Sequence, residues 1–163
     1  MSVDLAVPNE DDLAEMVEQV WVSYLDPEGI NPLLRTYEEA HESEVHSSVS
    51  ITGSWHGHIV YASSTTAAKM AAAAFLAMEA DEVSQEDLSD VLGELANIVG
   101  GNVKAMLPPG CFLSLPQVVL APESATRYPS AVRVTALYGS WQGEPVSVSM
   151  WQSRNDVKKE ETS

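Results

Sequence analysis

The sequence predicts an α+β fold in which two long helices pack across an antiparallel sheet of about six strands built from two related halves. Three observations carry this prediction: stretches with apolar residues at helical spacing, stretches in which β-branched residues alternate with polar ones, and a turn motif that occurs twice. A chain of 163 residues with 45% hydrophobic residues can bury one core. We therefore expect one domain over residues 1–154 and a polar, disordered tail over residues 155–163.

A first helix is predicted over residues 9–25, where apolar side chains recur every three or four positions behind an acidic first turn. Asn9 suits the capping position, and the sequence Asp-Pro-Glu-Gly at residues 26–29 ends the helix. We expect this helix to cover an end or the other side of the sheet. Residues 31–43 are interpreted as a loop or a short helix.

A hairpin and a second helix follow. Residues 45–63 show strand-like alternation on both sides of the turn motif Gly-Ser-Trp-His-Gly at residues 53–57. Ser64 or Thr65 can cap a helix over residues 66–78. The alanines of that helix allow a close approach to the layer beneath.

The third helix has the clearest signals. Ser84 is its predicted N-cap, acidic residues fill its first turn, and the helical pattern runs to about Met106 before Pro-Pro-Gly ends it. Further strands are predicted over residues 111–120, 131–141 and 146–152. The turn motif recurs as Gly-Ser-Trp-Gln-Gly at residues 139–143, which indicates either a duplicated hairpin with pseudo-twofold symmetry or a coincidence between two tight turns.

The charge balance narrows the classes of partner. The formal net charge is −16, whereas attraction to nucleic acid or anionic lipid requires clustered Lys and Arg. The longest nearly uncharged apolar run, residues 70–78, is about half as long as a membrane-spanning helix. Cys111 is the single cysteine, and no signal-peptide pattern is present. We therefore expect a cytoplasmic protein with no nucleic acid or membrane partner.

One face of the third predicted helix carries the candidate functional residues. At about 100° per residue, the arc opposite the apolar side collects Asp90, Glu94, Asn97, Gly101 and Lys104. A polar stripe of this kind is usually a solvated face. Asn97 and Gly101, however, are weak helix formers that solvation alone would not favour. The stripe therefore predicts a surface that another molecule approaches closely.

The spacing Asp90-x-x-x-Glu94-x-x-Asn97 resembles the signature of the chemotaxis phosphatases CheX and CheC, which is also seen in the flagellar switch protein FliY. Residues 93–102 (GELANIVGGN) are similar to the CheX branch, and the order hairpin, helix, helix, hairpin agrees over residues 45–152. The resemblance implies a CheC-like pseudo-twofold fold. It also implies a phosphatase that acts on the phosphorylated aspartate of a response-regulator receiver domain, such as CheY, in two-component signalling.

The same resemblance implies a role for each residue of the motif. Asn97 would orient the water that attacks phosphorus, Glu94 would form a salt bridge to the receiver's lysine, and Asp90 would help position the helix at the edge of the contact. The chain would need no cofactor of its own, because the receiver supplies Mg²⁺. CheX-like proteins pair through a sheet edge, so a homodimer is expected.

Several neighbouring residues allow two interpretations. Gly100 and Gly101 either let the partner approach the backbone or only allow close packing within the fold. Lys104 either touches acidic groups of the partner or is simply solvated. Asn102 projects onto the apolar side, where its amide would serve as a structural tie. The second predicted helix has Lys69 and alanines where CheC carries a second Glu and Asn, so one active face is expected.

Two other function classes stay open. A receiver-binding or scaffold module would dock the partner without hydrolysis, and a structural component of a flagellar switch would belong to a large assembly. A metal site is conceivable from His41, His46, His56 and His58. No clear carboxylate or thiolate ligand accompanies these histidines, so no metal is predicted.

Overall fold

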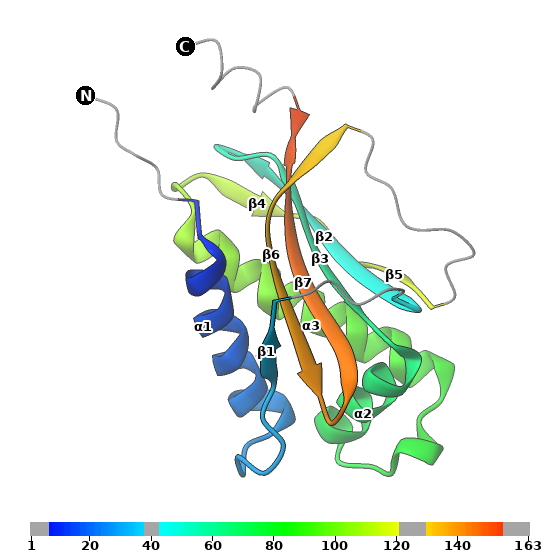
Figure 1. Cartoon of the computed structure of the whole chain (residues 1–163). Helices are drawn as coiled ribbons and strands as arrows, with labels where there is room; N and C mark the ends of the chain where they lie inside the picture. Colours follow the sequence, from blue (N-terminus) through cyan, green and yellow to red (C-terminus); the bar gives the residue numbers. More distant parts are fainter. Residues whose placement is uncertain (1–6, 38–42, 121–129, 155–163) are drawn as a thin grey trace.

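A computed structural model describes residues 7–37, 43–120 and 130–154 of the chain (Figure 1). The predicted tail and His41 lie outside these ranges. The helices are α1 (Glu10–Val20), continued by the π-helix η1 (Trp21–Leu25), then α2 (Thr65–Leu76), the short 3-10 helix η2 (Ala80–Glu82) and α3 (Gln85–Met106). The strands are β1 (Leu34–Thr36), β2 (Val45–Gly53), β3 (Gly57–Ser63), β4 (Cys111–Leu113), β5 (Gln117–Val119), β6 (Ala131–Trp141) and β7 (Glu144–Ser153).

The described strands form one antiparallel sheet of seven strands in the order β1-β6-β7-β3-β2-β4, with β5 also paired to β2. The predicted α+β fold is confirmed, with one strand more than the six expected. The interpretation of residues 31–43 as loop or short helix is wrong over β1, and residues 111–120 form two strands. Strands of three residues are too short to display an alternating pattern, so sequence periodicity does not reveal them.

The two long hairpins meet at the centre of the sheet. Strand β3 pairs with β7 from Gly57↔Gln152 to Ser63↔Val146, so the two hairpin turns lie at opposite ends of the sheet. This arrangement is the one expected for a pseudo-twofold axis between β3 and β7. The two turns differ in length. Two residues connect the last paired residues of β6 and β7, whereas residues 52–56 connect the last paired residues of β2 and β3.

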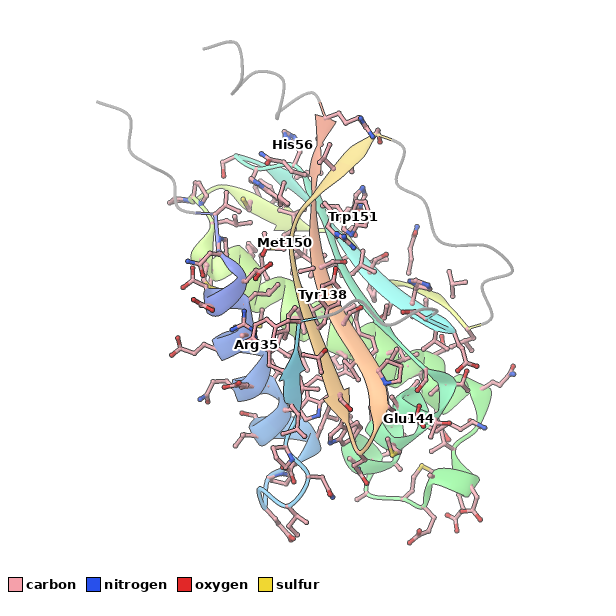
Figure 2. The ribbon with its side chains drawn as sticks, in the orientation of Figure 1. Arg35, His56, Tyr138, Glu144, Met150 and Trp151 are labelled. Atoms are coloured by element: carbon pink, nitrogen blue, oxygen red, sulfur yellow. The ribbon has the colours of Figure 1, made fainter. Side chains whose placement is uncertain are left out.

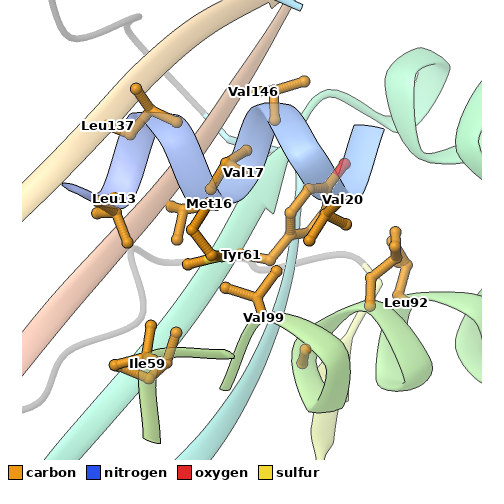
Figure 3. Close-up of a cluster of buried hydrophobic side chains, with 14 of the residues drawn as sticks. Leu13, Met16, Val17, Val20, Ile59, Tyr61, Leu92, Val99, Leu137 and Val146 are labelled. Atoms are coloured by element: carbon orange, nitrogen blue, oxygen red, sulfur yellow. The ribbon is translucent and has the colours of Figure 1, made fainter. Parts of the chain in front are cut away.

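The three α-helices of the described residues pack on one face of the sheet (Figure 1). Helix α3 lies on β2, α2 lies against α3, and α1 contacts both α3 and β6. Figure 3 shows the shared core, in which α1 side chains meet residues of the sheet and of α3. The expectation that the N-terminal helix covers an end or the other side of the sheet is therefore wrong. Its buried residues Leu13, Val17 and Val20 complete the same apolar layer as α3.

Local hydrogen bonds fix where each helix begins. Asn9 Oδ1 accepts from the Asp12 amide at 2.8 Å, and the Asp12 side chain accepts from the Asn9 amide at 3.0 Å. Ser84 and Asp87 form the same reciprocal capping box at α3. Ser64 caps α2 and also donates to Glu144 at 2.7 Å. The predicted caps Asn9 and Ser84 are confirmed, and the choice between Ser64 and Thr65 is settled in favour of Ser64.

Polar ties and aromatic contacts hold the edges of the fold. Arg35 in β1 lies beside α1, where its guanidinium donates to Asp11 at 2.9 Å (Figure 2). Trp141 is 2% exposed, packs edge-on against Trp21 with ring centroids 5.5 Å apart, and donates to the Asn31 carbonyl oxygen at 2.8 Å. Among the described residues, no helix combines the length and the apolar composition needed to cross a bilayer.

Candidate functional site

The candidate site lies on the solvent side of α3, the longest helix described, with 22 residues. Its buried side is formed by Val91, Leu92, Leu95, Val99 and Val103, which are at most 2% exposed. This burial on the sheet and on α1 holds the helix as a rigid support. The polar stripe predicted from the sequence therefore faces outward on a fixed element.

A shallow, open groove of about 320 Å³ runs along this stripe. Its lining consists of Ser89, Asp90, Gly93, Glu94 and Asn97 from α3, together with Pro116 and Val118 from the opposite side. Three of the five predicted residues of the stripe, Asp90, Glu94 and Asn97, are thus brought together in one groove. Gly101 and Lys104 lie further along the helix, outside the lining.

Glu94 and Asn97 are available to a partner. Glu94 is exposed and Asn97 is half-buried, and within the described residues neither side chain makes a hydrogen bond or an ion pair. Residues three apart on a helix place their Cβ atoms about 5–6 Å from each other. A carboxylate that accepts hydrogen bonds and an amide that donates and accepts them therefore face the same groove.

Gly101 of the stripe and its neighbour Gly100 have different surroundings. A methyl group on Gly100 would lie 2.5 Å from Val49 Cγ2 of the sheet, whereas a methyl group on Gly101 would meet nothing within 4 Å. Gly100 is therefore needed for packing of α3 on β2, and Gly101 leaves an open patch of backbone at the surface. The packing interpretation holds for Gly100, and the open-backbone interpretation stays available for Gly101.

These surroundings predict opposite effects of alanine on stability. Gly100→Ala should lower the free energy of unfolding by about 1–3 kcal/mol, because the β-branched Val49 is itself buried and must shift. Gly101→Ala should raise it by up to about 1 kcal/mol, because alanine is the better helix former. Urea denaturation of both variants measures the difference. Equal stabilities would contradict the packing described for α3.

Two other residues near the stripe clarify its extent. The projection of Asn102 onto the apolar side is wrong, since Asn102 is exposed. Its Nδ2 donates to the carbonyl oxygen of Ile98 at 2.8 Å, so the amide is tied to the backbone of its own helix. Lys104 is exposed in the last turn of α3, where a cation also interacts favourably with the helix dipole. Its contact with a partner stays a prediction.

The described histidines, His46, His56 and His58, lie elsewhere, on the sheet and its turn. Among the described residues, no group of three or more His, Cys, Asp or Glu side chains is arranged to hold a metal ion. His58 Nδ1 is 3.1 Å from Ser50 Oγ across the β2–β3 pair. His46 Nδ1 is buried and has no hydrogen-bond partner within the described ranges. These two residues therefore bear on the stability of the sheet.

Burial lowers the pKa of both His46 and His58, because desolvation disfavours the charged imidazolium. The unfolded chain, with His pKa values near 6.5, then binds protons before the folded chain does as the pH falls. The stabilising contribution is fully present above about pH 6.5 and is lost progressively as the pH falls from that value through the lower pKa of the folded chain. We expect His46→Gln to reduce the loss of stability between pH 7.5 and 5.5, measured by urea denaturation. An unchanged pH dependence in the variant would contradict this contribution.

Sequence reasoning missed the second wall of the groove. Pro116 and Val118 belong to a segment that follows α3 and returns beside it, held by pairing of β5 to β2. The sequence around Val118 predicts a strand. That this strand lies beside α3, however, depends on tertiary packing, which a local pattern does not show. Ser89 was also missed, one residue before the first position of the motif.

Comparisons with known proteins bear on this site. The model of the family described as chemotaxis phosphatase CheX matches residues 45–138, from β2 into β6 and including all of α3. A search of curated proteins gave no match. The matched family region contains every residue of the candidate groove.

Solved structures share the fold at low sequence identity. CheX from Vibrio vulnificus is 17% identical with a TM-score of 0.70, over 85% of this chain and 91% of that one. The CheX-CheY-BeF3-Mg complex from Borrelia burgdorferi contains a chain that is 16% identical with a TM-score of 0.69, over 91% of this chain and 99% of that one. FliY from Thermotoga maritima is 16% identical with a TM-score of 0.58, over 92% of each chain.

Proposed function

Since the chain belongs to the CheX family of chemotaxis phosphatases, we propose that it hydrolyses the aspartyl phosphate of a response-regulator receiver domain of the CheY type. The observation that carries the proposal is the accessible pair Glu94 and Asn97, which shares one groove on a rigid helix. The Borrelia burgdorferi CheX structure supports the choice of partner, because that protein was solved in a complex with CheY.

The proposed reaction requires little from this chain beyond positioning. Water adds to phosphorus while the bond between phosphorus and the aspartate oxygen breaks, which releases inorganic phosphate and restores the carboxylate. The receiver contributes Mg²⁺, which offsets charge on the phosphoryl oxygens, so the chain needs no cofactor of its own. Asn97 holds the attacking water in line behind phosphorus through its amide, without a proton transfer to its own side chain.

Glu94 and Asp90 serve the docking step in this proposal. The Glu94 carboxylate pairs with the receiver's lysine and fixes the depth to which Asn97 enters the pocket. Asp90 lies one turn away in the same groove and contacts the edge of the receiver. Gly101 leaves space for a receiver loop to approach the helix backbone. The cytoplasmic location and the homodimer through a sheet edge stay predictions.

A phosphorylated receiver assay tests the proposed function. Receiver domains from the same organism are phosphorylated with a small-molecule phosphodonor, and phosphate release is followed with and without this protein. At least one receiver should lose its phosphate about tenfold faster or more. A stable complex without faster release would make the chain a receiver-binding module, and the absence of both would overturn the proposal.

A further inference from the structure

The stretch from the end of β4 into β5 lies directly beside the polar stripe of α3. We call residues 113–118 the rim segment. A methyl group on Gly93 would lie 3.4 Å from Pro116 Cγ, and a methyl group on Gly100 would lie 3.4 Å from Leu113 Cδ2. Asn97 falls between these two glycines in the helix. The rim segment therefore runs alongside α3 at the level of Asn97, and its residues Pro116 and Val118 line the same groove as Asn97.

Hydrogen bonds to β2 hold the rim segment in place. The Ser114 amide donates to the Ser50 carbonyl oxygen at 2.9 Å, and the Ser50 amide donates to Ser114 Oγ at 2.9 Å. Ser114 Oγ in turn donates to the carbonyl oxygen of Leu115 at 2.9 Å. Both flanking strands also pair with β2, and Pro116 restricts its own backbone. These hydrogen bonds and strand pairings therefore hold the backbone on both sides of Leu115 in place.

Leu115 is the most exposed large hydrophobic residue in the described part of the chain, at 86%. A single exposed leucine is common on protein surfaces and needs no explanation by itself. Here, however, its neighbour Pro116 and then Val118 form the apolar wall of the groove that contains Glu94 and Asn97. Pro116 and Val118 therefore place apolar surface next to the polar residues that would enter the receiver, and Leu115 is the residue immediately before Pro116.

We propose that Leu115, Pro116 and Val118 form the apolar half of the receiver-docking surface and pack against apolar side chains that border the receiver's phosphorylation pocket. This inference rests on the proposed function. When Glu94 and Asn97 enter that pocket, the surface of the receiver around the pocket contacts the rim segment. The polar pair then sets orientation, and burial of Leu115 supplies affinity, as expected for an apolar anchor beside polar contacts.

Leu115→Ser tests the inference, with Leu34→Ser as its matched control. Leu34 is 61% exposed in β1, at the opposite edge of the sheet. Receiver dephosphorylation is measured as a function of the concentration of this protein. The concentration for half-maximal rate should rise about tenfold or more in Leu115→Ser, with the maximal rate unchanged. Leu34→Ser should match the wild type in both values.

The outcomes separate this inference from the proposed function. If the wild type is active and Leu115→Ser has the same half-maximal concentration and maximal rate, the docking role alone is overturned. A variant with a lower maximal rate at an unchanged half-maximal concentration also overturns it. If the wild type binds a beryllofluoride-activated receiver without hydrolysis, the proposed function fails, and a tenfold weaker complex with Leu115→Ser still supports the docking role. No binding to any receiver overturns both. Leu115→Ala replaces the serine variant if circular dichroism shows that the latter is unfolded.

Discussion

Asn97→Ala should reduce the dephosphorylation rate at saturating protein by about tenfold or more, to near the receiver's own rate of hydrolysis. Asn97 lies in the groove on a helix that is buried along its other side, and its amide makes no hydrogen bond within the described residues. Its removal should therefore take away the proposed water-positioning group and leave the fold intact. Binding to a beryllofluoride-activated receiver should weaken only a few-fold, since the docking contacts remain.

Asn102→Ala is the control for this variant. Asn102 is the other asparagine of α3 and is exposed, but its Nδ2 is engaged with the carbonyl oxygen of Ile98. Its replacement should leave the dephosphorylation rate unchanged. If Asn97→Ala kept the wild-type maximal rate, or if both variants lost it equally, the assignment of Asn97 as the water-positioning residue would be wrong.

Glu94→Lys should weaken the complex with the activated receiver by at least about tenfold, because the new cation would face the receiver's lysine. Calorimetry or fluorescence titration at constant ionic strength measures the dissociation constant. Glu18→Lys makes the same change of net charge at an exposed position of α1, away from the groove. The control should bind about as well as the wild type. Equal losses in the two variants would show that net charge, and not a contact of Glu94, controls the association.

The elements that the sequence predicts well are those with long periodic patterns and local caps. Helix α3 shows both, because Ser84 and Asp87 define its start and the apolar residues repeat along the whole helix. The sides of this helix follow from the same repeat, so the exposure of Glu94 was predictable before the fold was known. The role of Asn97, by contrast, came from a resemblance to a family and stays to be tested.

The features that the sequence did not predict depend on contacts between distant segments. Strand β1 exists because three residues pair with β6 and Arg35 reaches α1. The position of α1 beside α3 depends on how the two apolar faces share one side of the sheet. Likewise, Pro116 becomes part of the groove only because β4 and β5 both pair with β2. No local sequence pattern predicts where these segments pack.

The most direct measurement is the structure of this protein bound to a receiver held in its activated state by beryllofluoride and Mg²⁺. The account predicts that α3 faces the receiver, with the Glu94 carboxylate against the lysine and the Asn97 amide within hydrogen-bond distance of the in-line water position. Docking through another face, with Glu94 and Asn97 left in solvent, would contradict it.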